Sequence, residues 1–145
     1  MARWWKKMSR TDAQQPTKGY PVKYLRLTQN GMAPDPDTWF RGTMFGSLTW
    51  SPGWFGEHPV SKAFATFRVV DAGKLVDVYE LMLTHDPDRP LNHQHPATWI
   101  HWGPDLESYL EANSKEDWFV VVEQTAANQW SITWQQARPA WTPAT

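Results

Sequence analysis

The histidines of this chain are the residues whose type and spacing come nearest to a catalytic pattern. Four of the five lie within seventeen residues, and in an extended backbone His93 and His95 point the same way. Two imidazoles presented in this way can bind one metal ion, with His101 or Asp86 as a third ligand and an open position for water. Without a metal, two of these histidines could act as acid and base on a phosphoester.

This histidine cluster has no acidic ligand at a diagnostic spacing and matches no known metal signature. A polar loop with exposed histidines explains the same residues without catalysis. We therefore predict no metal and no cofactor, and keep His93, His95 and His101 only as weak candidates for a catalytic or metal site. Phosphate-binding, dinucleotide-binding and nucleophile-elbow motifs are absent, so nothing in the sequence demands an enzyme.

Tryptophan is the second kind of residue that stands out, with eleven in 145 residues. The regular alternation around Trp130 and Trp134 predicts core positions, and Trp118 is expected to join them. Five others lie in a turn-rich region or beside His101, where their faces could stack on a planar or cationic ligand or anchor a protein partner. These five candidate contact residues are Trp39, Trp50, Trp54, Trp99 and Trp102.

Charge is distributed unevenly along the chain. Residues 1–26 carry seven basic side chains and one acidic one, whereas the remainder carries seven basic and fourteen acidic ones. Cations interleaved with tryptophans suit contact with nucleic acid or an anionic surface, for which Arg3, Lys6, Lys7 and Arg10 are the candidates. A basic arm could instead fold back on its own acidic domain, or act only as a solubilising terminus.

The elements that must position these residues are mainly strands. Alternation and turn signals predict strands over 21–28, 63–70, 75–84, 98–102, 117–124 and 130–134, with a hairpin connection at 71–74. Pro104 opens a predicted helix that runs to about Ala112. Residues 29–61 read as irregular because asparagine, glycine and proline turn signals recur there.

This order of elements predicts an α+β protein with a single compact domain. We expect a curved, mainly antiparallel sheet of about five to six strands with one helix packed on a face. The domain should span 20–138, after a basic, aromatic arm over 1–19 and before an extended tail over 139–145. Absence of cysteine, of a signal peptide and of an apolar run of roughly 18 residues predicts a soluble, cytoplasmic protein without a transmembrane segment.

Three functional hypotheses follow from these patterns. The leading one is a non-enzymatic, inhibitor- or immunity-like module that binds a protein partner through its aromatic loop surface and acidic body. The first alternative is a small-ligand protein whose tryptophans enclose a planar or cationic molecule around His101. The second alternative is a small hydrolase or nuclease that uses His93, His95 and His101, with or without a metal.

Overall fold

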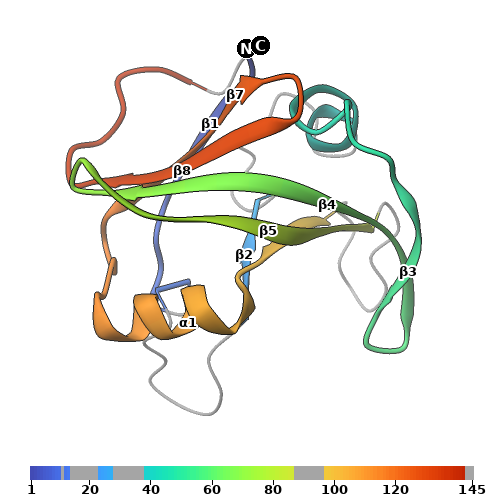
Figure 1. The fold of residues 1–145 in the computed structure, drawn as a ribbon, viewed down its shortest axis with the longest axis horizontal. Helices are drawn as coiled ribbons and strands as arrows, with labels where there is room; N and C mark the ends of the chain where they lie inside the picture. The colour runs from blue at the N-terminus through green and yellow to red at the C-terminus, as the bar shows by residue number, and fades with distance from the viewer. Residues whose placement is uncertain (11, 14–22, 28–37, 87–96, 143–145) are drawn as a thin grey trace.

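The computed structural model of the protein describes residues 1–10, 12–13, 23–27, 38–86 and 97–142. Within these residues the chain forms a single curled, mixed sheet of eight strands together with two helices (Figure 1). The strands are β1 (Arg3–Lys7), β2 (Tyr24–Arg26), β3 (Ser51–Phe55), β4 (His58–Asp71), β5 (Lys74–Asp86), β6 (Ala97–His101), β7 (Phe119–Ala126) and β8 (Gln129–Gln135). Their order in the sheet is β1-β7-β8-β4-β5-β6-β2, with β3 paired to the first half of β4.

The β4–β5 hairpin is the longest element of the sheet and follows directly from the sequence. Ala72 and Gly73 both have positive φ, at 51° and 78°, which is the backbone of a two-residue type I′ turn. Glycine adopts this conformation without strain, so Gly73 suits the position. The hairpin predicted around residues 71–74 is therefore confirmed, with strands longer than expected because pairing continues to Ser61 and His85.

The expected number of strands was too low, and the sheet is not purely antiparallel. Strand β8 runs parallel to β4, from Thr66 opposite Gln129 to Asp71 opposite Trp134. Strand β3 was missed because Pro52 and Gly53 are turn signals in sequence. The strand tolerates both residues because, within the sheet order, β3 pairs only with β4 and so lies at an edge.

The predicted N-terminal arm is wrong for residues 3–7. These residues are β1, which pairs antiparallel with β7 from Arg3 opposite Glu123 to Lys7 opposite Phe119. Trp4 on this strand is fully buried, and its ring meets that of Phe40 edge to face at 5.9 Å. Burial of so large a ring stabilises the strand, and the neighbouring Lys6 is itself buried in an ion pair with Asp12.

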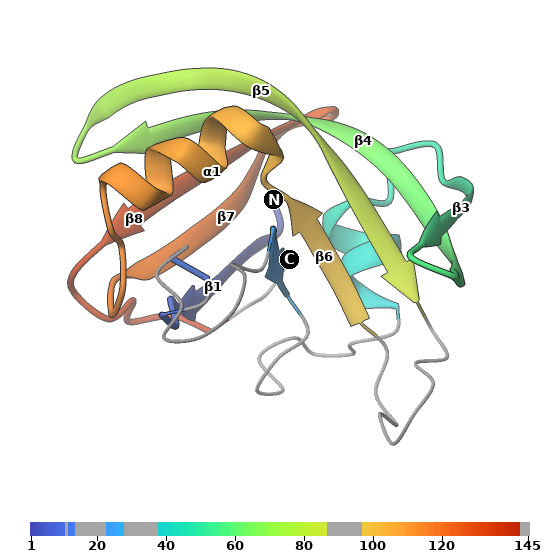
Figure 2. The ribbon, with the colours of Figure 1, turned by 90° about the horizontal axis from the view of Figure 1, so that it is seen from below.

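Two helices close the curl of the sheet at different ends. Helix α1 (Gly103–Ala112) crosses one opening, where Leu106 and Leu110 enter the core (Figure 2). Its predicted bounds are confirmed, with the backbone N–H of Asn113 donating to Tyr109 O at 2.8 Å. The second helix, η2 (Trp39–Met44), is a π-helical turn that the sequence analysis did not predict, and it lies at the other end of the curl.

The core fills the inside of this curl. Its largest fully buried side chains are Trp4, Trp102, Trp130, Phe40, Phe45 and Phe67. The curl also brings the edge strands β1 and β2 close together, so that Lys6 Nζ donates to the Arg26 carbonyl at 3.2 Å. Across the described residues, neither helix has the length and apolar character needed to cross a bilayer.

The segment after β8 packs on the outer face of the sheet. Trp5 Nε1 donates to the Trp141 carbonyl at 2.6 Å, and the guanidinium groups of Arg3 and Arg138 lie over the rings of Trp141 and Trp5. Pro139 is buried. The described part of the predicted tail, up to residue 142, is thus held against β1, while residues 143–145 lie outside the described residues.

Candidate functional site

Four aromatic side chains from three strands form the most distinctive polar–apolar cluster of the molecule. Tyr24 from β2 contacts Phe55, Trp99 and His101, with ring centroids 5.3, 6.0 and 5.9 Å away. Phe55 from β3 in turn lies 4.8 Å from Trp99 and 5.4 Å from His101. We call these four residues the aromatic site.

Strand register explains why these residues meet. Tyr24 lies directly opposite His101 in the β2–β6 pair, and Trp99 is two residues before His101 on the same face of β6. Phe55 lies at the end of β3, on the far side of β4 and β5 from these strands. Its contact with Tyr24 therefore requires the strong curl of this part of the sheet.

His101 is the polar centre of the aromatic site. Its Nε2 lies 2.8 Å from Thr84 Oγ1 on β5, and Nδ1 has no hydrogen-bond partner among the described residues. Burial lowers the pKa of His101 from 6.5 to about 4, because the charged imidazolium loses solvation among apolar rings. The ring is therefore neutral near pH 7 and offers one ring nitrogen to a ligand.

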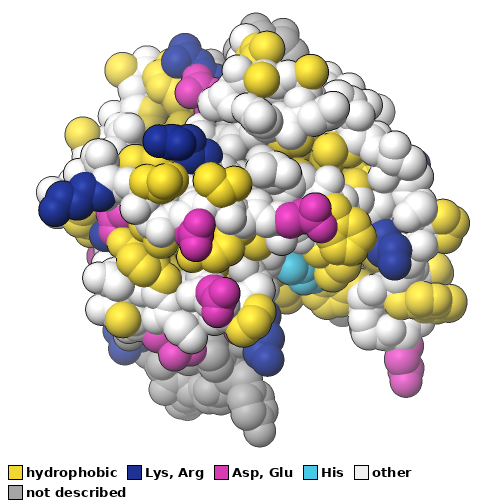
Figure 3. Space-filling model, in the orientation of Figure 1, with side chains coloured by type: hydrophobic (Ala, Val, Ile, Leu, Met, Phe, Trp, Pro, Cys, Tyr) yellow, Lys and Arg dark blue, Asp and Glu magenta, His cyan; other side chains and the backbone are white. Residues whose placement is uncertain are grey.

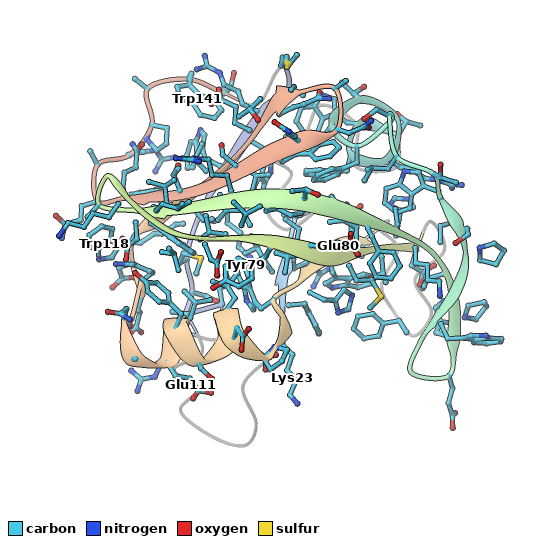
Figure 4. The ribbon with its side chains drawn as sticks, viewed as in Figure 1. Lys23, Tyr79, Glu80, Glu111, Trp118 and Trp141 are labelled. Carbon is cyan, nitrogen blue, oxygen red and sulfur yellow. The ribbon has the colours of Figure 1, made fainter. Side chains whose placement is uncertain are left out.

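The molecular surface is hollowed beside the β3–β4 hairpin. A notch separates the β3–β4 hairpin from the body of the molecule, and hydrophobic and histidine side chains line it (Figure 3). Tyr24, Phe55 and His101 are each half-buried, whereas Trp99 is 6% exposed. Lys23 directly precedes Tyr24, and Glu80 lies on β5 four residues before Thr84 (Figure 4).

A histidine–carboxylate pair lies at the hairpin end of the same sheet face. Nε2 of His58 is 2.7 Å from Oδ2 of Asp86, whose side chain is almost completely buried. His58 is the direct partner of Phe55 across the β3–β4 turn. Asp86 lies two residues after Thr84 on β5, so both side chains belong to the face that carries the aromatic site.

The structure separates the five tryptophans that the sequence placed in one contact surface. Trp39 and Trp102 are buried in the core, and Trp99 is buried in the aromatic site. Trp50 is half-buried, with Nε1 donating to Phe45 O at 3.1 Å. Trp54 alone among the five is strongly exposed, at 68%, so the five do not form one exposed surface, and contact of any of them with a ligand or partner stays a prediction.

Trp39 and Trp102 are buried because of the backbone path at η2 and at the end of β6. The π-helical turn directs Trp39, Phe40 and Met44 into the core from a region that looks irregular in sequence. Trp102 follows β6 at the turn into α1, where Gly103 has a φ of +76° and the chain changes direction into the core. Trp130 and Trp134 are buried as predicted, and Trp118 is half-buried against the core.

Two of the three candidate histidines, His93 and His95, lie outside the described residues. His101 belongs to the aromatic site, with Thr84 as its hydrogen-bond partner. His85 is fully buried on the core face, where Nδ1 lies 2.7 Å from Thr98 Oγ1. Among the described residues there is no group of three or more His, Cys, Asp or Glu side chains that could hold a metal ion.

The candidate anion-binding residues differ in how firmly the protein's own groups hold them. Lys6 is buried and paired with Asp12 at 2.9 Å, so it is not available to a nucleic acid. Lys7 lies 3.7 Å from Asp117. Arg10 lies 3.6 Å from Glu116, and Arg3 covers the ring of Trp141. The side chains of Lys7 and Arg10 are 60% and 51% exposed, so their contact with nucleic acid or an anionic surface stays a prediction.

Sequence reasoning missed Tyr24, Phe55, Thr84 and the His58–Asp86 pair. Alternation along 98–102 already places Trp99 and His101 on one face, which was a usable signal. No local signal identifies Phe55, because its place in the site depends on the curl of four neighbouring strands.

Comparison with protein-family models, with curated proteins and with solved structures gives no match for this chain. Its function must therefore be inferred from the chemistry of its own residues.

Proposed function

We propose that this protein binds a small, flat, uncharged ligand at the aromatic site. The observation that carries the proposal is the gathering of Tyr24, Phe55 and Trp99 around a neutral His101. Aromatic faces stack on planar rings with about 1–3 kcal/mol per ring, and Nδ1 of His101 supplies a hydrogen bond that orients the ligand.

Charge favours an uncharged ligand over a cationic one. The carboxylate on the same face, Asp86, is buried and already paired with His58. The charged residue directly before Tyr24 is Lys23, a cation, which does not attract a cationic ligand (Figure 4). A ligand cation would gain only its attraction to the ring faces, whereas a flat neutral ring gains stacking without losing ionic hydration.

Calorimetric titration with 4-methylumbelliferone, a flat uncharged bicyclic phenol, tests this proposal, with tetramethylammonium as the cationic comparator. We expect saturable binding of the flat compound that Phe55→Ala weakens about tenfold, in keeping with loss of one stacking contact. Trp54→Ala is the matched control, because Trp54 precedes Phe55 on β3 and points to the opposite face. Equal binding by the Phe55 variant, a preference for the cation, or no saturable binding of flat rings would overturn the proposal.

A protein partner remains a second candidate, favoured by one observation. Trp54 is exposed directly opposite Pro59, also exposed, at the end of the projecting β3–β4 hairpin. Exposed tryptophans are typical anchors of protein interfaces. A photo-crosslinking amino acid at position 54 should capture one defined protein in cells, with no capture from the solvent-exposed position 108 on α1. Equal labelling at both positions would count against this candidate.

A further inference from the structure

We propose that His58 and Asp86 form a hydrolytic site for esters of the ligand bound by the aromatic site, with His58 as the general base. This inference rests on the proposed ligand site and adds a reaction to it. It uses neither His93 nor His95, which lie outside the described residues, and no metal ion.

The pair has the arrangement that general-base catalysis requires. Asp86 Oδ2 lies 2.7 Å from His58 Nε2, so the carboxylate holds the ring and favours the tautomer with its proton on Nε2. The lone pair of the neutral ring is then on Nδ1. This atom has no hydrogen-bond partner among the described residues, and the His58 side chain is 34% exposed. A water molecule can therefore reach the basic nitrogen.

Asp86 is buried and His58 is partly exposed, which suits a base that acts on water. The Asp86 side chain is 3% exposed, so its charge acts on His58 with little screening by solvent. A pair that served only to fix the hairpin would not need an accessible imidazole. In this pair the carboxylate that positions the ring is buried, and the imidazole is accessible to solvent. A base that acts on water needs this arrangement.

Strand register places this pair beside the ligand site. His58 pairs with Phe55, whose ring packs on Trp99 and His101. Asp86 pairs with Ala97, two residues before Trp99 on the same face of β6. A flat group stacked on Phe55 would therefore hold a substituent near the His58 end of the site.

The reaction balances with water as the only co-reactant. Nδ1 of His58 takes a proton from water while the water oxygen bonds to the acyl carbon. The tetrahedral intermediate collapses, the acyl–oxygen bond breaks, and its electron pair stays on the leaving phenol oxygen. The proton on His58 returns to that oxygen, which gives a carboxylic acid, a phenol and the original neutral imidazole. Asp86 acts as a positioning residue throughout.

Hydrolysis of 4-methylumbelliferyl acetate, followed by fluorescence, tests the proposal. We expect saturable turnover roughly a hundredfold above the buffer rate, the scale of general-base catalysis. His58→Gln should reduce turnover to the buffer rate while 4-methylumbelliferone still binds. Asp86→Asn should lower kcat at least tenfold with KM unchanged. The variant no longer favours the His58 tautomer protonated on Nε2, whereas the binding surface is unaltered. Leu75→Ala, at an exposed position at the start of β5, should behave as the unmodified protein.

Each result separates the reaction from the ligand site. Binding of 4-methylumbelliferone without ester turnover, or turnover that survives His58→Gln, overturns the hydrolytic proposal and leaves the ligand site standing. If the unmodified protein does not bind 4-methylumbelliferone, the proposed ligand site itself is overturned. Because the His58 variant could disturb the hairpin, kcat of the unmodified protein is also compared in light and heavy water. A slower rate in heavy water supports proton transfer from the attacking water, and equal rates contradict it.

Discussion

Nζ of Lys6 lies 2.9 Å from Oδ2 of Asp12, and both side chains are nearly sealed from solvent. Burial lowers the pKa of Lys6, and the facing carboxylate of Asp12 opposes that shift. The same ammonium donates to the Arg26 carbonyl, so one side chain links β1 to β2 where the sheet does not close by backbone pairing.

Removal of one member of this ion pair should be costly. Lys6→Met leaves Asp12 charged and buried, and we expect it to lower the free energy of unfolding by about 3–5 kcal/mol. The double variant Lys6→Met, Asp12→Leu removes both charges and should recover most of that loss. Denaturant unfolding of the three proteins measures the effect. A single variant within 1 kcal/mol of the unmodified protein would contradict the buried pair.

Two tryptophans that look alike in sequence should differ sharply in their effect on stability. Trp102 is fully buried and Trp54 is 68% exposed. Trp102→Ala should cost about 3–5 kcal/mol because it leaves a large cavity. Trp54→Ala should stay within about 0.5 kcal/mol. Thermal unfolding of the two variants gives the comparison, and similar losses would show that the hairpin end is buried in solution.

Stability should fall in mildly acidic solution because of His101. Its pKa is about 4 in the folded protein and 6.5 when unfolded, so between these values the unfolded chain binds more protons. The contribution of this residue is complete above pH 6.5 and is lost as the pH falls towards 4. We expect a loss of about 1–3 kcal/mol, since one pKa unit is worth about 1.4 kcal/mol and partial exposure screens some of it.

His101→Gln provides the control for this pH dependence. Glutamine does not titrate, so the variant should lose less stability over the same pH range while it keeps a polar group facing Thr84. Denaturant unfolding at a series of pH values gives both curves. Identical slopes for variant and unmodified protein would mean that His101 is not held neutral by burial.

The hydroxyl of Tyr109 fixes α1 to the end of β4. It donates to Oδ2 of Asp71, which also accepts from Lys115 Nζ at 2.8 Å. Burial raises the pKa of Tyr109 to about 12, and the hydrogen bond to Asp71 adds to this effect. Asp71 Oδ1 is buried without a hydrogen-bond partner among the described residues, so the carboxylate depends on its other oxygen.

Tyr109→Phe should therefore destabilise the protein by about 1.5–3 kcal/mol, the usual cost of losing a hydrogen bond to a charged group. Its ring still stacks on Trp134, whose centroid is 6.5 Å away, so packing should survive. Thermal unfolding at neutral pH measures the loss. Since the phenol stays protonated in the folded protein up to about pH 12, the unmodified protein should lose this stabilisation as the pH rises above 10, and the phenylalanine variant should not. An unfolding curve unchanged by the substitution would rule out the link.

Elements with strong local signals were predictable from the sequence. The β4–β5 hairpin, α1 and the strands around Ile100, Val121 and Ile132 carry alternation, a type I′ turn or a proline at the helix start. These features depend on residues close together in the chain, so local chemistry is enough to identify them.

The missed elements depend on distant partners. Strand β1 looks like a charged arm until Val122 lies opposite Trp4, and η2 looks irregular until Phe40 meets Trp4. The aromatic site likewise combines residues that are close in sequence with residues that are distant. His101 and Trp99 were recognised because they are neighbours on one strand, whereas Phe55 reaches them only through the curl of the sheet.

The pairing of β1 with β7 has a consequence for the order of folding. Arg3 has no strand partner until Glu123 has been synthesised, a separation of 120 residues along the chain. Residues 3–7 must therefore wait for residues 119–123, and pairings of such range close slowly because of the entropy lost in forming the loop. During that delay Trp4 and Trp5 stay uncovered, so synthesis leaves the apolar side chains of this first strand open to chaperones or to aggregation until the sheet is complete.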